Sequence, residues 1–281
     1  MSMKFKFAAC QMNIGDDKEN NLRNAVKAIE EAVSNGADMV ALPEMFNCPY
    51  NSSLFPEYAE EAESSRTLNV ISDAASRFDV YVIAGSIPEK SSGKIYNTSF
   101  IVDRKGRVIG KHQKLHLFDI DIPGRIVFRE SDTLSAGTQI TVVDTEFCKV
   151  GIAICYDMRF PELSRIMALK GARLIVVPGA FNMTTGPAHW EILTRTRALD
   201  NQVYFASVSP ARNEEASYVA YGHSMICDPW GAIVAKAGVN EEIIYAQIDL
   251  DTVERIRREL PLLNHRREDI YKITEEGVDR L

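Results

Sequence analysis

The chain has 281 residues and a formal net charge of −7, with 32 Lys and Arg against 39 Asp and Glu. This acidic excess argues against nucleic acid and anionic membrane surfaces as partners, because both select a basic face. Hydrophobic residues make up 46% of the chain, as in an ordinary globular protein whose core needs no disulfide bridges. No apolar run approaches the roughly 18 residues of a membrane span, and the charged N-terminus does not resemble a signal peptide.

The cysteines indicate a reducing compartment. They are odd in number and unequally spaced, and no CxxC pair occurs, so the sequence predicts neither a disulfide framework nor a zinc site. We therefore expect a cytoplasmic protein in which a conspicuous cysteine is reactive rather than bridged. Three matches to the N-glycosylation pattern, which begin at Asn51, Asn97 and Asn182, are then coincidences. The cysteines are Cys10, Cys48, Cys148, Cys155 and Cys227.

Strand and helix signals alternate along the chain without a repeat or a linker. This pattern predicts a single α/β domain over residues 1–281, with mixed sheets and helices outside them. Residues 112–138 lack clean periodicity and predict a long functional loop. In the first half we expect, in order, the strand Phe5–Gln11, the helix Leu22–Val33, the strand Met39–Leu42, the helix Thr67–Phe78, and the strands Val80–Ile87 and Ile95–Val102.

The second half continues the alternation. A hairpin is expected first, and Pro161 marks the first turn of the helix that follows it. The predicted elements are, in order, the strands Thr141–Val143 and Val150–Cys155, the helix Pro161–Leu169, the strand Leu174–Val177, the helix Trp190–Leu199, the strands Val203–Val208, Ser224–Cys227 and Ile243–Ile248, and the helix Thr252–Leu260.

Cys155 is the strongest candidate for a reactive group. An apolar strand delivers it to a sharp turn directly before a predicted helix. A thiol that faces a helix N-terminus has its thiolate favoured by the helix dipole and the free amides, and the N–H of Tyr156 can donate to a developing oxyanion. The alternative is a buried structural cysteine that ends a core strand, because cysteine is among the most buried residue types.

Two other polar residues follow apolar strands. Glu44 comes directly after Leu42 and Pro43, where desolvation would raise the pKa of its carboxyl toward that of a general base. Alternatively, Glu44 caps a helix or pairs with a cation at the surface. Lys114 opens the long loop, where a lysine is usually solvated. If the sheet aligns these strand ends, a thiol, a base and a cation meet in an acyl-transfer site.

Together these segments resemble the nitrilase superfamily, the carbon–nitrogen hydrolases. The resemblance runs from about Phe5 to the end of the chain, and it is specific because the three motifs occur in the family's order, each after a strand. It implies a four-layer α-β-β-α sandwich with no metal or organic cofactor. The motifs are Leu42-Pro43-Glu44, Lys111-His112-Gln113-Lys114 and Cys155-Tyr156-Asp157.

The resemblance also implies roles for four residues. Cys155 would attack an amide carbonyl, Glu44 would act as general base, and Lys114 would stabilise the tetrahedral intermediate. A second glutamate, which falls on Glu130, would position Lys114. A homodimer or higher homo-oligomer is implied too, and the residues expected at its interface are Phe160, Trp190 and the C-terminal segment.

Within the superfamily, several segments resemble the omega-amidase branch, whose substrates are 2-oxoglutaramate and 2-oxosuccinamate. The alternatives are the branch that cleaves deaminated glutathione and hydrolases of N-carbamoyl or aliphatic amides. The segments that carry the likeness are residues 116–124, 179–191, 200–204 and 209–212.

A small oxo-dicarboxylic monoamide needs a cation for its carboxylate. Arg159, four residues after Cys155, can bind a carboxylate in a bidentate manner, or it can instead form a buried ion pair with Glu162 or another acid. The remaining expected substrate contacts are Tyr156, the apolar wall of Phe181, the hydroxyl of Thr185, and the rings of Tyr50 and Phe118, although aromatic residues on loops also serve packing.

Two other classes of protein fit the sequence less well. A metal-dependent amidohydrolase would use His112 and His116 with Asp119 and Asp121, but Gln113 stands where the HExxH motif requires glutamate. A catalytically silent interaction protein is disfavoured because every catalytic position is present. Of the three remaining histidines, His189 and His223 are expected to be structural.

Overall fold

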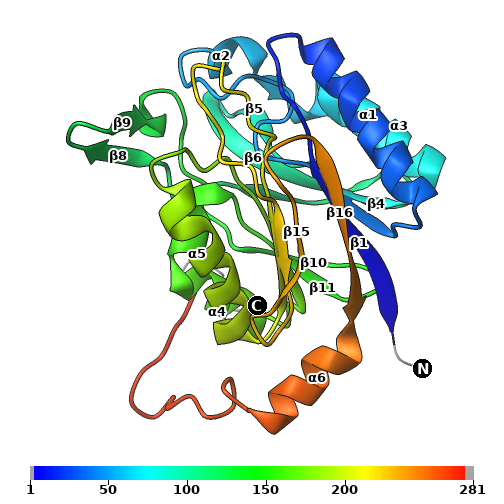
Figure 1. Ribbon diagram of the computed structural model, residues 1–281, viewed down its shortest axis with the longest axis vertical. Helices are drawn as coiled ribbons and strands as arrows, with labels where there is room; N and C mark the ends of the chain where they lie inside the picture. The colour runs from blue at the N-terminus through cyan, green and yellow to red at the C-terminus, as the bar shows by residue number, and fades with distance from the viewer. Residues whose placement is uncertain (1–2, 276–281) are drawn as a thin grey trace.

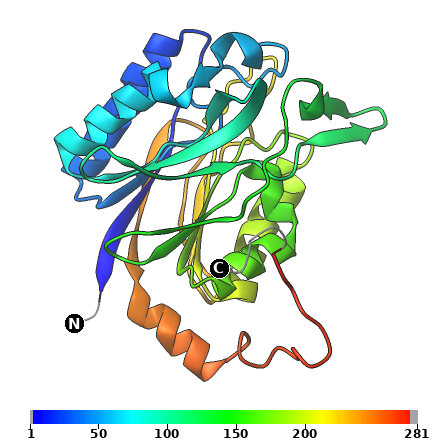
Figure 2. The ribbon, with the colours of Figure 1, turned by 180° about the vertical axis from the view of Figure 1, so that it is seen from behind.

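In the computed structural model, which describes residues 3–275, two β-sheets pack face to face and helices cover their outer faces (Figures 1 and 2). The larger sheet has the strand order β16-β1-β2-β4-β6-β5-β3, with β7 also paired to β6. The smaller sheet has the order β10-β11-β12-β13-β14-β15. This arrangement is the expected α-β-β-α sandwich.

The elements of each layer are as follows. The strands of the larger sheet are β1 (Lys4–Gln11), β2 (Met39–Ala41), β3 (Glu60–Glu61), β4 (Tyr81–Ile83), β5 (Ile87–Ser91), β6 (Lys94–Val102), β7 (Val108–Gln113) and β16 (Glu242–Asp249). Those of the smaller sheet are β10 (Thr141–Asp144), β11 (Lys149–Ile152), β12 (Leu174–Pro178), β13 (Tyr204–Val208), β14 (Met225–Cys227) and β15 (Ile233–Lys236). The helices are α1 (Lys18–Ser34), α2 (Phe55–Tyr58), α3 (Arg66–Phe78), α4 (Pro161–Leu169), α5 (Gly186–Asn201) and α6 (Leu250–Glu259).

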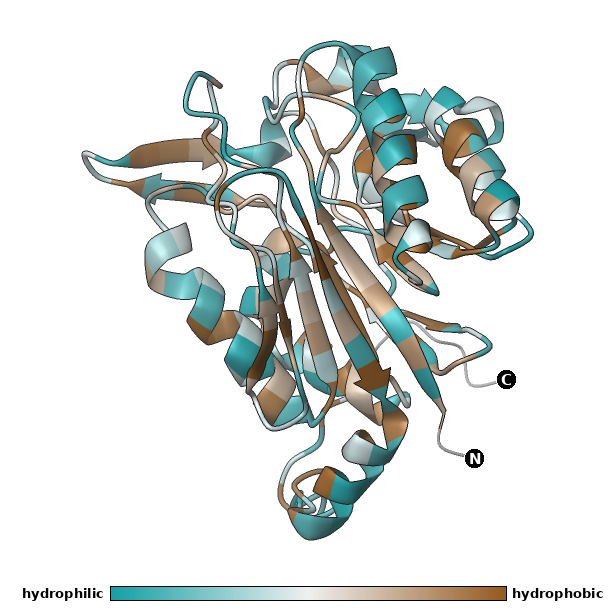
Figure 3. Cartoon of the chain, turned by 45° about the vertical axis from the view of Figure 1, so that its right-hand side comes forward, coloured by the Kyte–Doolittle hydropathy of each residue, from teal (hydrophilic) through white to brown (hydrophobic). Residues whose placement is uncertain are grey.

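The alternation of side chains in β1 shows how the layers are held. Phe5 and Phe7 point into the core between the two sheets, whereas Ala8 and Cys10 point into a second core beneath α1 and α3. A third core joins the smaller sheet to α4 and α5. Both faces of each sheet are therefore covered, as parallel strands require. Because α1 and α3 cover the sheet on one side only, each carries both hydrophilic and hydrophobic residues (Figure 3).

Parallel strands bring the candidate residues to one region. β1, β2 and β4 run parallel in the larger sheet, and β11, β12 and β13 run parallel in the smaller one. Ligands of α/β proteins bind where such strands present their carboxyl ends. Glu44 follows β2, and Cys155 follows β11.

Two predicted elements are wrong. The strand expected over Val80–Ile87 is broken after β4, because Gly85 adopts a positive φ of 44°. A Cβ at Gly85 would lie 2.0 Å from the carbonyl oxygen of Pro43, so only glycine fits beneath the segment that leads to Glu44.

The expected loop over residues 112–138 is also wrong in part. It contains the end of β7 and a hairpin of β8 (Asp119–Ile122) and β9 (Ile126–Arg129), which projects from the body of the molecule (Figures 1 and 2). Asp-Ile-Asp-Ile in β8 has the period of a half-buried strand, but a run this short is easily missed. The helix α2 and the strands β3, β5 and β15 were not predicted, although β5 begins at Ile87, the last residue of the expected strand. The other predicted elements are confirmed with ends that differ by a few residues.

Trp190 is not available to a second subunit, since it is 1% exposed and lies in the core of the smaller sheet. Phe160 is half-buried and stacks on His116 at a centroid distance of 3.6 Å. The homo-oligomer and the cytoplasmic location remain predictions. Within residues 3–275 we find no helix whose length and hydropathy would allow it to cross a membrane.

Candidate active site

Glu44, Lys114, Glu130 and Cys155 meet at one place in the structure. Lys114 Nζ lies 3.1 Å from Glu44 Oε1 and 2.8 Å from Glu130 Oε1. The Cys155 thiol is close enough to the Glu44 carboxylate for each group to shift the pKa of the other. The side chains of Glu44, Lys114 and Glu130 have no exposed surface, and Cys155 is 4% exposed. Lys114 is therefore not the solvated lysine that its position in the sequence would usually indicate, and Glu44 is neither a helix cap nor a surface ion pair.

Cys155 sits on a strained turn. It opens the 3₁₀ helix Cys155–Arg159 directly after β11, with a φ of 46°. A non-glycine residue in this left-handed region is uncommon, and such strain gathers at functional sites. Gly179, which follows β12, makes room for the turn, because a Cβ there would lie 3.2 Å from the Cys155 Cα atom.

The electrostatic prediction for Cys155 is wrong. Burial raises the pKa of its thiol well above the ordinary value, and the nearby Glu44 carboxylate raises it further, despite the opposing charge of Lys114. The turn after Cys155 is short, and α4 begins only at Pro161, so desolvation outweighs any stabilisation by a helix terminus. The thiol is neutral and needs a base to become a nucleophile.

Glu44 has the environment of such a base. Its Oε2 accepts a hydrogen bond of 2.7 Å from the Ala180 N–H, and its Oε1 accepts one of 2.9 Å from Asn97 Nδ2. Burial raises the pKa of the Glu44 carboxyl, as the sequence predicts, and the Glu130 charge adds to this effect while Lys114 opposes it. A carboxylate with a raised pKa is a stronger proton acceptor.

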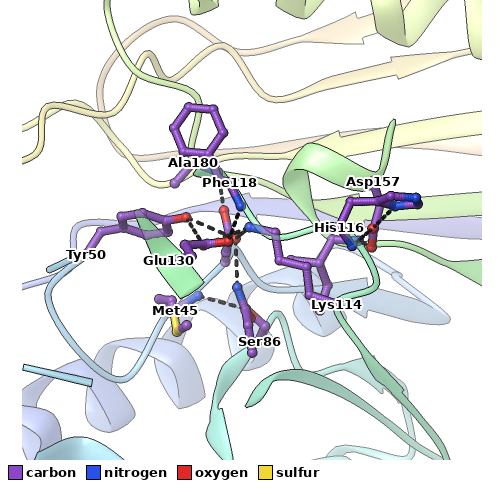
Figure 4. Close-up of polar contacts among 12 residues, drawn as sticks. Met45, Tyr50, Ser86, Lys114, His116, Phe118, Glu130, Asp157 and Ala180 are labelled. Atoms are coloured by element: carbon purple, nitrogen blue, oxygen red, sulfur yellow. Dashed lines mark hydrogen bonds and ion pairs between the residues drawn. The ribbon is translucent and has the colours of Figure 1, made fainter. Parts of the chain in front are cut away.

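Lys114 is held as a cation between two carboxylates. Desolvation disfavours its charge, but Glu130 and Glu44 together raise its pKa above the ordinary value. Glu130 is itself anchored, since Tyr50 donates from its hydroxyl to Oε1 and Phe118 donates from its main-chain N–H to Oε2, each at 2.7 Å (Figure 4). The structure thus gives Tyr50 and Phe118 polar contacts with Glu130 in addition to the packing of their rings.

Asp157 connects the segments that carry Lys114 and Cys155. No sequence pattern assigns it a role. Its buried carboxylate accepts from His112 Nε2 at 3.0 Å and, through Oδ1, from the N–H and Nδ1 of His116 at 2.9 and 2.7 Å (Figure 4). It also accepts from the Ile154 N–H at 3.0 Å. Burial opposes its charge, but the hydrogen bonds from the two histidines hold its pKa well below the usual range. The partners lie on both sides of Lys114 and directly before Cys155.

These contacts also account for the histidines that the metal-site alternative would have used. His112 and His116 both bind Asp157, while Asp119 accepts from the Ser131 N–H. Across residues 3–275 we find no group of three or more His, Cys, Asp or Glu side chains arranged to hold a metal ion.

Arg159 lies beside the site without an acidic partner. Its guanidinium packs over the rings of Phe181 and Tyr156, at 4.7 and 5.5 Å from their centroids, and Nη1 lies 3.1 Å from His189 Nδ1. Desolvation lowers the pKa of Arg159, and the groups that oppose this effect are Cys155, Tyr156 and Tyr218 rather than a carboxylate. Its Nε is buried and has no hydrogen-bond partner in the described part of the chain. The ion pair with Glu162 is therefore not formed.

The other expected contacts divide into two groups. Phe181 is buried against Trp190 at a centroid distance of 4.9 Å and contacts Arg159, whereas the hydroxyl of Thr185 is engaged by Asn182 Oδ1 at 3.2 Å. Tyr218, which the sequence did not single out, packs on Tyr50 at 4.5 Å. A cavity of about 500 Å³ opens onto the catalytic cluster. Its lining includes Glu44, Tyr50, Ala180 and Tyr218.

The model of the carbon–nitrogen hydrolase family matches residues 6–258 of the chain. The chain belongs to the carbon–nitrogen hydrolases. Among curated relatives of this family, an omega-amidase of Xenopus laevis is 53% identical over 273 residues, which cover 97% of this chain and 99% of that protein.

Solved structures of the family agree with the fold. Nit3 of Saccharomyces cerevisiae, described as a member of branch 10 of the nitrilase superfamily, superimposes with a TM-score of 0.87 at 44% identity, covering 94% of this chain and 97% of that one. The NitFhit protein of C. elegans superimposes with a TM-score of 0.89 at 35% identity, covering 99% of this chain and 69% of that one.

Proposed function

We propose that this carbon–nitrogen hydrolase is an omega-amidase, which converts small oxo-dicarboxylic monoamides to the dicarboxylate and ammonia through a thioester on Cys155. The observation that carries the proposal is the buried cluster of Cys155, Glu44 and Lys114, since a neutral thiol, a base of raised pKa and a fixed cation are the parts of an acyl-transfer site. The 53% identity with the omega-amidase of Xenopus laevis over nearly both whole chains supports the substrate class.

Acylation begins when Cys155 Sγ attacks the amide carbonyl carbon and Glu44 takes the thiol proton. The carbonyl oxygen becomes an oxyanion, which the Lys114 ammonium and the N–H of Tyr156 stabilise. Glu44 then gives its proton to the amide nitrogen, and the carbon–nitrogen bond breaks. Ammonia leaves, and the acyl group remains on sulfur as a thioester.

Deacylation uses the same groups again. Glu44 takes a proton from a water molecule, whose oxygen attacks the thioester carbon. The second tetrahedral intermediate collapses as the carbon–sulfur bond breaks, and the proton on Glu44 returns to the departing sulfur. The product is the dicarboxylate, and Lys114 and the Tyr156 N–H stabilise the oxyanion in both halves.

Arg159 is the group that we assign to the substrate's distal carboxylate. Three observations support this assignment: Arg159 lacks an acidic partner among residues 3–275, its buried Nε has no hydrogen-bond partner there, and its charge interacts with Cys155. The rings of Phe181 and Tyr156 against the guanidinium form an apolar wall suited to a short carbon chain. A charged planar fork in such surroundings binds a carboxylate in a bidentate manner.

Ammonia release from a panel of amides tests this function. The panel contains 2-oxoglutaramate, 2-oxosuccinamate, deaminated glutathione, an N-carbamoyl compound and an aliphatic amide, with the Cys155→Ala protein as the blank. We expect kcat/KM to be highest for the two oxo-dicarboxylic amides. A clear preference for deaminated glutathione would contradict the proposed substrate class while leaving the amidase chemistry intact.

A further inference from the structure

Asn97 begins one of the three segments that match the glycosylation pattern, yet the structure buries it completely at the catalytic centre. It lies in β6, and its side-chain Nδ2 donates to Glu44 Oε1 at 2.9 Å. Its main-chain carbonyl accepts from the N–H of Lys114 at 2.8 Å. One residue therefore holds both the carboxylate of Glu44 and the chain segment that carries Lys114.

We propose that Asn97 is a positioning residue that fixes the Glu44 carboxylate in its ionised, proton-accepting orientation. This inference rests on the proposed function, because it presupposes that Glu44 is the general base. A hydrogen bond donated to a carboxylate favours the charged form, and a neutral amide provides that bond without adding a second cation to the site.

The contacts of Glu44 show why a neutral donor is needed. Oε2 is held by the Ala180 N–H, whereas Oε1 receives Asn97 Nδ2 at 2.9 Å and the Lys114 ammonium at 3.1 Å. The Tyr50 hydroxyl lies farther from Oε1, at 3.4 Å, and makes its shorter contact, 2.7 Å, with Glu130. Lys114 is shared with Glu130 at 2.8 Å and is also the cation that the oxyanion requires. The charge of Lys114 is thus divided among two carboxylates and the oxyanion. Asn97 supports Oε1 through a hydrogen bond that none of these other groups shares.

The side-chain amide of Asn97 has only one orientation that suits the site. Its Oδ1 is buried and has no hydrogen-bond partner among residues 3–275. Rotation of the amide would place Oδ1 against the Glu44 carboxylate, so the observed orientation is the one that the site permits. A buried acceptor without a partner reduces stability, so the orientation of the amide is set by the contact of Nδ2 with Glu44 and not by its oxygen.

The test compares Asn97→Ala with Asn201→Ala. Asn201 is a matched control because it is also buried, donates one hydrogen bond of 2.9 Å through Nδ2 to the Arg197 carbonyl, and has an unpaired Oδ1, but it lies at the end of α5. We expect Asn97→Ala to lower kcat about 10- to 100-fold with KM within about threefold. In this variant, the pH below which kcat/KM falls (the acidic limb of the pH profile) should be higher than in the wild type. The pKa of Glu44 rises when a donor to its ionised form is lost. Asn201→Ala should leave the limb unchanged.

Asn97→Asp covers the case in which the alanine variant fails to fold, since aspartate keeps the shape of asparagine. It replaces the donor with a second carboxyl beside Glu44, so we expect a larger loss of kcat and a further upward shift of the acidic limb. Wild-type kinetics in either folded Asn97 variant, or losses equal to those of Asn201→Ala with no movement of the limb, would overturn the inference. Glu44→Gln separates the two proposals: an active Glu44→Gln enzyme contradicts the base itself, whereas an inactive one beside a normal Asn97 variant contradicts only the role of Asn97.

Discussion

The Lys114 Nζ atom and the Glu130 Oε1 atom lie 2.8 Å apart, and neither side chain has any exposed surface. A buried cation of this kind is stable only when its charge is compensated, and removal of one partner leaves the other uncompensated. Glu130 in turn is oriented by donors from two separate segments, Tyr50 and Phe118. The lysine is therefore held in place before any substrate arrives.

Replacing Glu130 by glutamine tests this relationship. Glutamine keeps the shape of the side chain but removes its charge. Its amide nitrogen accepts no hydrogen bond, so one of the two bonds that Tyr50 and Phe118 now donate to separate oxygens is lost. We expect kcat to fall about 10- to 1000-fold, in the range of a lost oxyanion-stabilising contact, with a smaller change in KM. Steady-state ammonia release measures both constants, and an unchanged kcat would show that Lys114 does not depend on Glu130.

The guanidinium of Arg159 is the second residue to test. Arg159→Lys keeps the charge but removes the planar fork, so KM for 2-oxoglutaramate should rise about 10-fold or more, while an uncharged aliphatic amide should be unaffected. Arg165→Lys is the control, because Arg165 is a half-buried arginine of α4 whose pKa is also lowered by desolvation. Unchanged kinetics in the Arg159 variant would assign it a structural role.

Asp157 should contribute stability with a defined pH dependence. Its folded-state pKa lies below the ordinary value, so its contribution is present above about pH 4, the pKa expected in the unfolded chain, and is lost as the pH falls toward the folded-state pKa. Asp157→Asn should lower the free energy of unfolding at pH 7 by about 2–4 kcal/mol.

Urea unfolding at pH 7 and at pH 3.5 measures this contribution, and the difference between wild type and variant should shrink at the lower pH. A difference that stays constant would mean that the charge of Asp157 is not the source of the stability. Because Asp157 joins the Lys114 and Cys155 segments, the folded variant should also lose activity.

The pH dependence of catalysis follows from the raised pKa of Glu44. The base must be ionised to accept the thiol proton, so activity is lost as the pH falls through that raised pKa. The acidic limb of kcat/KM should therefore lie above about 4.3, the usual pKa of a glutamate. An enzyme with an exposed catalytic cysteine would show a rise in kcat/KM near pH 8.5, where such a thiol ionises. We expect no such rise here, because burial raises the pKa of Cys155. An acidic limb at or below pH 4 would contradict this environment for Glu44.

The positions of Glu44 and Cys155 could be anticipated because each follows an apolar strand, and parallel strands bring their carboxyl ends together. Lys114 and Glu130 came from the likeness to the family, because a lysine at the start of an aperiodic segment carries no sign of burial by itself. The layers followed from the alternation of strands and helices, whereas the β8–β9 hairpin was too short to interrupt the apparent loop.

Other features of the site depend on tertiary contacts that no local pattern encodes. Asp157 and Asn97 are single polar residues that contact distant side chains: His116 lies 41 positions from Asp157, and Glu44 lies 53 positions from Asn97. Their roles therefore appear only when the strands are assembled. The pKa of Cys155 was predicted in the wrong direction because the sequence shows the turn and the following helix but not the depth of burial.

In the proposed mechanism, the acyl group of the substrate passes through Cys155. This step can be tested by rapid mixing of the enzyme with 2-oxoglutaramate, acid quenching and mass spectrometry of the Cys155 peptide. We expect a transient thioester on Cys155, formed together with one equivalent of ammonia, and neither adduct nor ammonia from Cys155→Ala. Ammonia released at the wild-type rate by Cys155→Ala, with no adduct on the wild-type enzyme, would contradict the mechanism.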